Sequence, residues 1–441
     1  MFHATGNHFF AGLFFLLLTV FFAVPQSVAI TFEPIYVDAP GTGFYDETPL
    51  DEAYKAPIHA DGNFAETLGE ARKNAFETAL GLFEIWLVGD NTVRVEASFR
   101  DDLGQGSLAG AWPARLVYKP SETNPEMWLP IALEENKSGQ EINGPTEADV
   151  RIVFNENEDF YYGLSLELLE LEELFPNEVP DTFILVAVHE IIHGLGFSDS
   201  VNSNDGSFRS GSDSETPDWV VLDGPFIDGI PSIYDVNLYS ERDEELLINL
   251  SDEQRLQAIT SGTGLLWDGT SNGENSYSCA QLIGKVREVK ERGGVDSLGR
   301  PRLYAPSPYE SGSSVSHFDP TGNDDDIMNP GYAPLTFIDL TFGVLRDIGW
   351  RLKRDAGDDH FPFNVKDLLV SEVLEECTVA TTDTSPPPSE QRPVPESGGG
   401  GCAIAETESM PRNAIFNLFL VLSIMLSVSL RRSRKISLSE K

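Results

Sequence analysis

The stretch Val186-Ala187-Val188-His189-Glu190-Ile191-Ile192-His193-Gly194-Leu195-Gly196-Phe197 holds the pattern H-E-x-x-H followed by x-x-G. Residues four apart on a helix lie on one face, one turn apart, so the imidazoles of His189 and His193 can bind the same zinc ion. Glu190 follows the first histidine and can take a proton from a water molecule that the metal holds. The stretch therefore predicts a helix that carries a hydrolytic zinc site.

The residues on either side favour a buried helix that ends abruptly. Residues 183–188 are all apolar, and Asp181 and Thr182 before them are candidate helix N-caps. Gly194 and Gly196 can take the left-handed backbone that ends a helix and lets the chain turn sharply.

A catalytic zinc site needs a third protein ligand and leaves a fourth position for water. Asp199 lies ten residues after His189, and His317 lies 124 residues after His193 in a segment rich in Ser and Gly. A methionine, Met328, follows His317 by eleven residues. Spacing alone does not choose between Asp199 and His317.

The motif at 189–198, the long insertion after it, Ser316-His317 and the turn that begins at Met328 resemble the leishmanolysin type of metzincin zinc peptidase. Secreted bacterial relatives with a C-terminal sorting or anchor tail give a closer likeness, which includes Leu-Arg-Asp-Ile-Gly-Trp at 345–350. The resemblance covers roughly residues 31–354.

This resemblance assigns roles to residues outside the helix motif. It favours His317 over Asp199 as the third zinc ligand, and it implies that Met328 forms a turn beneath the metal. Tyr332, four residues past Met328, becomes a candidate donor to an oxyanion, with an ordinary turn aromatic as the alternative.

Periodicity predicts an α+β chain. Apolar residues recur at three- and four-residue steps over 67–88, which indicates a helix, and Thr67 with Glu70 forms a candidate capping box. Four strands are predicted, at 30–37, 93–99, 114–118 and 149–155. Two further helices are predicted, at 252–259 and over 337–348.

The resemblance implies a metzincin-like catalytic domain. Its upper subdomain is a twisted mixed sheet with a backing helix and the active-site helix, and its irregular lower subdomain holds the Met-turn and a C-terminal helix. In that family the strand before the active-site helix is a sheet edge that pairs with an extended substrate. That position is 150–154 here, so Val150, Ile152 and Phe154 are predicted to bind peptide, with plain sheet scaffold as the alternative.

The domain boundaries follow from changes in composition. Residues 1–29 lack Lys, Arg, Asp and Glu, contain a long apolar run and end in a small-x-small cleavage site, which predicts a signal peptide. The catalytic domain is expected at 30–354, divided into an upper subdomain at 30–196 and a lower one at 197–354. Residues 355–411 are expected to be a linker, rich in Pro, Gly, Ser and Thr, with a sorting motif.

The C-terminal tail predicts contact with a membrane. An apolar segment at 414–430 and the basic residues after it indicate a transmembrane segment over 412–435 with a cytoplasmic basic end. With the Gly run and Cys402 before it, the tail resembles the sorting tails of secreted Gram-negative proteins, which a membrane protease cuts near the cysteine. A simple single-pass anchor is the alternative, so the protein is expected to cross the inner membrane and to be secreted or held at the cell surface.

Composition argues against nucleic acid as a partner, but it does not settle whether a disulfide or a structural calcium site is present. The net charge of −41 opposes binding to nucleic acid. Cys279 and Cys377 could pair in an oxidising exterior, although no spacing argument supports the pair. Structural calcium is permitted by the many Asp and Gly residues between the two histidine clusters, but no EF-hand loop supports it.

The sequence as a whole predicts a secreted or surface-anchored zinc metalloendopeptidase that hydrolyses extracellular proteins, with Glu190 as general base. Two alternatives stay open at this point. One is a catalytically silent, zinc-containing adhesion or binding protein, and the other is a zinc hydrolase of cell-wall material.

Overall fold

The computed structural model describes residues 29–104, 106–119, 126–164, 181–208, 220–221, 229–269, 278–286, 293–331 and 338–352. Within these ranges the chain combines a mixed sheet with several helices, in agreement with the predicted α+β class. Nearly all of the predicted signal peptide, and everything predicted after residue 352, lies outside them. No helix in the described part of the chain is long and apolar enough to span a bilayer.

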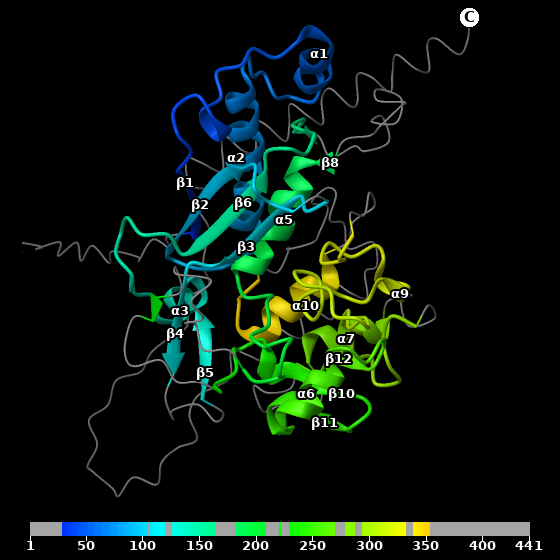
Figure 1. Ribbon diagram of the computed structural model, residues 1–441. Coiled ribbons are helices and arrows are strands. Elements are labelled where there is room, and N and C mark those ends of the chain that lie inside the picture. The colour runs from blue at the N-terminus through cyan, green and yellow to red at the C-terminus, as the bar shows by residue number, and fades with distance from the viewer. Residues whose placement is uncertain are drawn as a thin grey trace, which may run out of the picture.

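The largest sheet has four strands in the order β1-β2-β6-β3 and fills the upper part of Figure 1. Strands β1 (Thr31–Tyr36), β2 (Thr92–Arg100) and β6 (Val150–Asn155) run parallel to one another. Strand β3 (Ala109–Pro113) pairs with β6 in the antiparallel sense and ends the sheet. The strands predicted at 30–37, 93–99 and 149–155 are thus present.

The predicted edge strand is an interior strand. Ile152 of β6 is paired with Ala97 of β2 on one side and with Ala111 of β3 on the other. The prediction equated the strand that comes last in the sequence with the edge of the sheet. The sequence of β3 is Ala-Gly-Ala-Trp-Pro, which has weak strand propensity, and its pairing depends on contacts with a strand about 40 residues later. Val150, Ile152 and Phe154 are buried and cannot bind an added peptide strand.

Two helices cover the same face of this sheet. Helix α2 (Leu68–Trp86) and helix α5 (Phe183–Gly194) both contact Phe154 of β6, because the Phe76 and Phe183 rings lie 5.8 and 4.6 Å from its ring. In β2 the residues alternate between buried and partly exposed, so the other face is not covered in the same way. Both helices therefore pack on one face of the sheet.

The N-terminus of α2 confirms the predicted capping box. The Thr67 side chain accepts from the Glu70 N–H, and the Glu70 carboxylate accepts from the Thr67 N–H. The helix then buries a stripe of small and aromatic residues on the sheet, including Ala75, Phe76 and Phe83.

Shorter elements complete the first half of the described chain. They are η1 (Gly43–Tyr45), α1 (Glu52–Ala60), β4 (Arg115–Lys119), β5 (Met127–Pro130), α3 (Ile131–Ser138), β7 (Phe160–Tyr161), β8 (Asp181–Thr182) and β9 (Val220–Val221). The strand predicted at 114–118 is β4, but it belongs to a separate sheet of order β5-β4-β9.

The second half has little regular structure and lies in the lower part of Figure 1. Its elements are η3 (Asp235–Asn237), β10 (Leu238–Ser240), β11 (Glu245–Leu246), η4 (Leu247–Asn249), α6 (Asp252–Ala258), β12 (Leu265–Trp267), α7 (Cys279–Val286), α9 (Pro320–Asn323) and α10 (Asp339–Ile348). The predicted helices at 252–259 and 337–348 correspond to α6 and α10.

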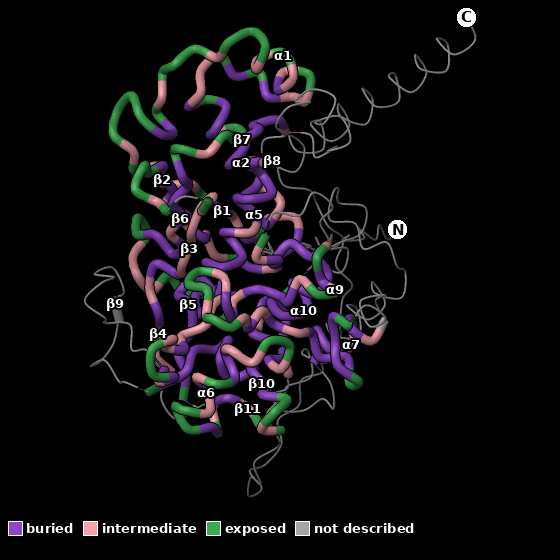
Figure 2. The backbone as a smooth tube through the Cα atoms, turned by 45° about the vertical axis from the view of Figure 1, so that its right-hand side comes forward, coloured by how far each residue is buried: buried purple, intermediate pink, exposed green. Residues whose placement is uncertain are grey.

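Helix α10 joins the two halves. Every residue of it is buried, as the purple tube in Figure 2 shows, and its Phe342 ring lies 5.4 Å from Trp86 at the end of α2. On the lower side Asp347 accepts from the Trp267 indole and from the Cys279 N–H, at 2.9 and 2.7 Å. One continuous hydrophobic core therefore runs through both halves and holds them in a single arrangement.

Candidate metal centre

Helix α5 carries the H-E-x-x-H motif, and all of its residues except His189 are buried. Thr182 occupies the N-cap position, without the predicted side-chain cap. Gly194 allows the close approach to the sheet, because a Cβ atom there would lie 2.2 Å from Val150 Cγ1. The helix is therefore held against β6 at the turn that contains His193.

The last residue of the helix is Gly194, so of the two glycines predicted to end it only Gly196 takes the left-handed backbone. Its φ of +116° reverses the chain, and the N–H groups of Gly196 and Phe197 donate to the carbonyls of His193 and Ile192. The Phe197 carbonyl in turn accepts from His193 Nδ1 at 2.8 Å. The glycine turn thus both ends the helix and orients the second histidine.

His317 reaches the same place from the lower half, after a strained turn. Val315 has a φ of +73°, a conformation that costs a β-branched residue about 1–3 kcal/mol. Two hydrogen bonds hold it there, from its N–H to the Tyr304 carbonyl at 2.7 Å and from the Tyr234 hydroxyl to its carbonyl at 2.9 Å. The turn places the buried His317 side chain against α5.

The three histidines meet through one ring nitrogen each. His189 Nε2 lies 3.1 Å from His317 Nε2 and 3.1 Å from His193 Nε2. Each Nδ1 lies against a backbone carbonyl instead: Ile327 O for His189, Phe197 O for His193 and Ser313 O for His317, at 2.7, 2.8 and 2.8 Å. A carbonyl can only accept, so each Nδ1 carries the proton and each Nε2 presents a lone pair to the centre.

Burial keeps these imidazoles neutral. Desolvation lowers the pKa of His189 to about 4 and that of His193 to about 3, and it lowers the pKa of His317 well below its usual value. Three lone pairs therefore face one another with no proton to share between them. A metal ion satisfies such a set of donors, and the three residues form a group that could hold one.

Glu190 adds an acidic group beside the histidines. Its side chain is 6% exposed, and its Oε2 has no hydrogen-bond partner within the described residues. Desolvation raises the pKa of this carboxyl to about 8. A buried carboxyl with this pKa, one residue after a histidine of the group, can accept and release a proton near neutral pH.

The segment at Met328 is connected to the centre through the Ile327 carbonyl. Met328 is fully buried, its carbonyl accepts from the Phe318 N–H at 2.8 Å, and the preceding carbonyl, of Ile327, orients His189. Asp326 ties this turn to α10, because its Oδ1 accepts from the Met328 N–H at 3.2 Å and from the Thr341 hydroxyl at 2.6 Å.

Sequence reasoning assigned no role to Asp326 or Thr341. The role of Asp326 could have been predicted in part, because an aspartate carboxylate often accepts from the backbone N–H two residues later, which here is that of Met328. The role of Thr341 could not, because its partner lies fifteen residues away on another element.

The remaining predicted site residues fall outside the centre or outside the described residues. Asp199 is not in the group of three histidines, and its Oδ1 accepts from the Val201 N–H at 3.0 Å. Tyr332 lies outside the described residues. Cys279 is disulfide-bonded, but its partner lies outside those residues too, so pairing with Cys377 stays a prediction.

Comparison of the chain with protein-family models, with curated proteins and with solved structures gives no match in any of the three.

Proposed function

We propose that this chain is a zinc metalloendopeptidase of the metzincin type, resembling the leishmanolysin group. The observation that carries the proposal is the convergence of three neutral imidazoles, with the buried Glu190 adjacent to His189 on the same helix. Zinc fits the donor set, because a tetrahedral ion bonded to nitrogen at about 2.0–2.1 Å separates its ligands by about 3.3 Å. The Nε2 separations of 3.1 Å are close to that value.

His189, His193 and His317 would hold the zinc ion. When bound, zinc supplies Lewis acidity, which polarises a carbonyl group and makes water a nucleophile near neutral pH. Glu190 accepts the proton of the attacking water at its carboxylate and then returns it to the leaving amine. The Nδ1 hydrogen bonds to backbone carbonyls keep the three rings in the orientation and tautomer that this role requires.

Strand β3 is the proposed substrate edge, in place of β6. The Ala114 N–H donates to the Asp149 carbonyl, and the Leu108 carbonyl accepts from the Asn155 N–H. The backbone polar groups of Ala114 and Leu108 therefore point toward β6. Since strand groups alternate in direction, the backbone N–H and C=O of Ala109 and Ala111 point to the open side. An extended peptide can add to this edge by β-augmentation, and β3 lies alongside α5 in Figure 1.

The location and partners of the enzyme are also part of this proposal. The signal sequence at 1–29 would export the chain, and protein or peptide substrates would be extracellular. The tail at 412–435 would then anchor the protein, or a sorting protease would remove it near Cys402.

The test compares the wild type with Glu190→Gln on a mixed peptide library, with and without a zinc chelator. Glu190→Gln is expected to lower the cleavage rate by about 10²–10⁴-fold, because a general base contributes that much. Zinc content should stay at one ion per chain in both proteins. Glu253→Gln, an exposed residue of α6, is the matched control and should cleave as the wild type does.

Three results would contradict the proposal. Cleavage by Glu190→Gln at the wild-type rate would remove the general base. Absence of bound zinc would remove the ligand assignment. Bound zinc with no cleavage of any peptide would favour the adhesion or binding protein instead.

A further inference from the structure

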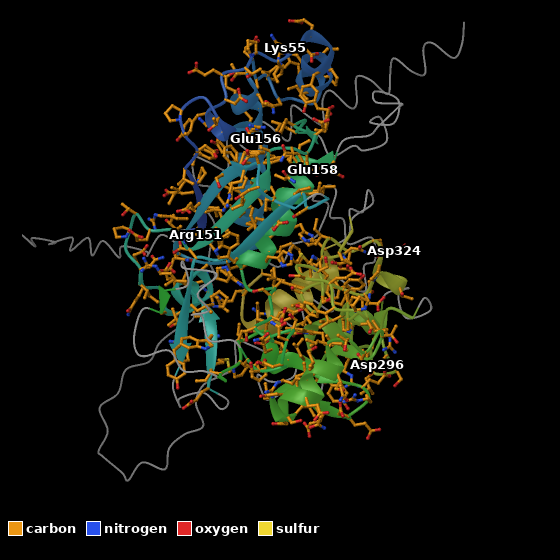
Figure 3. The ribbon with its side chains drawn as sticks, in the orientation of Figure 1. Lys55, Arg151, Glu156, Glu158, Asp296 and Asp324 are labelled. Carbon is orange, nitrogen blue, oxygen red and sulfur yellow. The ribbon has the colours of Figure 1, made fainter. Side chains whose placement is uncertain are left out.

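A second group of ionisable side chains lies apart from the histidines, and we call it the carboxylate cluster. It consists of Glu135, Glu141 and Asp149, each of which offers an oxygen within 4.8 Å of the others. Glu135 is on α3, Glu141 is in the loop after that helix, and Asp149 directly precedes β6. Figure 3 labels Arg151, two residues after Asp149, and so locates this end of β6.

Two of the three carboxylates are buried and are held by the loop around them. Glu135 Oε1 accepts from the N–H groups of Ile142 and Asn143, at 2.8 and 3.4 Å. Asp149 Oδ1 accepts from the Asn143 amide at 2.9 Å, and its Oδ2 accepts from the Arg94 N–H at 2.7 Å. The oxygens are thus fixed by backbone and amide donors rather than free to turn toward water.

One carboxylate oxygen of the cluster has no donor. Glu135 is 1% exposed, and its Oε2 has no hydrogen-bond partner within the described residues. A buried acceptor that lacks a donor is unfavourable by about 1–3 kcal/mol. A cation bound among the three carboxylates would satisfy this oxygen and offset the charge of all three, whereas a proton would neutralise only one.

The carboxylate cluster has more negative than positive groups. Arg94 Nη1 lies 2.8 Å from Glu141 Oε2 and supplies one positive charge against three carboxylates. The same guanidinium is shared with Glu33, whose Oε2 lies 3.9 Å from Arg94 Nε. Desolvation, followed by the charge of Asp149, raises the pKa of Glu135 to about 8, and desolvation raises the pKa of Asp149 to about 6.

We propose that Glu135, Glu141 and Asp149 bind one calcium ion. All three donors are oxygens, the ligand type that hard cations prefer, and calcium accepts the irregular geometry of a loop. Backbone carbonyls and water can complete the six to eight ligands that calcium takes.

Calcium at this position would stiffen the support of the proposed catalytic helix. The ion would connect α3 and the loop after it to Asp149, which directly precedes β6. The next residue, Val150, is the one that packs against Gly194 of α5, beside His193. The site would be structural, and its occupancy does not depend on whether the histidines bind zinc or whether the chain cleaves peptides.

The test measures calcium binding and thermal stability of the full-length protein in a Glu190→Gln background, which prevents self-digestion. Equilibrium dialysis should give one tightly bound calcium ion per chain. Saturating calcium should raise Tm by about 5 °C, because a ligand bound only by the native state stabilises it. Magnesium, which demands stricter geometry, should bind at least about tenfold more weakly.

Two variants keep the test sensitive. Glu135→Gln retains the acceptor for Ile142 but removes the charge. Glu141→Gln changes an exposed residue and keeps a side-chain oxygen that can accept from the Gly144 N–H. Both should weaken calcium binding at least about tenfold, since charge count sets the affinity of such sites. Glu147→Gln is the matched control, because this carboxylate is in the same loop but pairs with Arg115, and it should bind calcium as the parent does.

Three outcomes would overturn the proposal. One is the absence of a stoichiometric calcium ion at millimolar calcium. A second is binding that Glu135→Gln and Glu141→Gln leave unchanged, which would assign it to diffuse attraction by an acidic protein. In the third, stability rises on mild acidification and calcium has no effect, so Glu135 and Asp149 share a proton and the site is not a cation site.

Discussion

The histidine group and the carboxylate cluster respond to burial in opposite ways. Each brings together three ionisable side chains in a largely buried place. Burial lowers the pKa of the histidines, so they become neutral and their lone pairs stay available without any counter-ion. Burial raises the pKa of Glu135 and Asp149, so near neutral pH these groups keep charge only against a desolvation penalty.

The two groups therefore differ in whether their geometry is stable without a bound metal ion. The imidazoles are oriented by three backbone carbonyls, and removing a metal from them leaves no buried charge. The carboxylates have one arginine against three negative groups, so their geometry is most stable with a proton or a cation present. The histidine group is therefore expected to persist without metal, and the carboxylate cluster to loosen without its partner.

The largest effect is expected from His317→Ala. Two histidines on one helix turn remain, and the third ligand is lost. Zinc affinity should fall by more than about 100-fold, since removing an outer-shell partner alone costs about 10–100-fold. Zinc content after dialysis and a competition titration measure this change. Asp199→Ala is the matched comparison and should retain zinc, and the reverse result would make Asp199 the third ligand.

A smaller effect is expected from Thr341→Val. This change keeps the buried shape but removes the hydroxyl that donates to Asp326, so the turn that orients His189 is less firmly held. Zinc affinity should fall by about tenfold, as for other outer-shell partners. Circular dichroism would verify that the variant is folded.

The control for this variant is Thr260→Val, which makes the same change at the end of α6, where the hydroxyl donates to Leu256. Zinc affinity should not change there. Equal losses in both variants would mean that the effect is one of general stability and not of the metal centre.

The smallest effect is expected in the pH dependence of stability at the carboxylate cluster without divalent cations. The folded-state pKa of Glu135, about 8, and that of Asp149, about 6, lie above their unfolded values. The folded protein thus binds more protons, and stability falls as pH rises from about 4 to about 8. Glu135→Gln should remove part of this fall, so the Tm difference between variant and wild type should grow by a few degrees from pH 5 to pH 8.

Saturating calcium should abolish the fall in wild-type stability with rising pH, because the ion compensates the negative charge that Glu135→Gln removes. Other buried acids, such as Asp347, contribute their own pH dependence, so the comparison uses the difference between the two proteins. A difference that is constant across the pH range would show that Glu135 does not titrate in the folded state.

Features that depend on neighbours within one or two turns can be predicted from the amino-acid sequence alone. His189, Glu190 and His193 lie on one helix because residues at i and i+4 share a face, and the glycine at 196 ends that helix because only a residue without Cβ readily takes a φ of +116°. The capping box at Thr67 and the burial of one side of β2 follow from the same kind of local rule.

Contacts between residues far apart in the sequence are visible only in the tertiary structure. The place of β6 inside the sheet, the arrival of His317 at α5, the link from Asp326 to Thr341 and the carboxylate cluster each join segments whose local patterns do not refer to one another. The physical reason is that strand order and side-chain convergence minimise the free energy of the whole packed core. A local period states which face of an element is buried, but not which partner buries it.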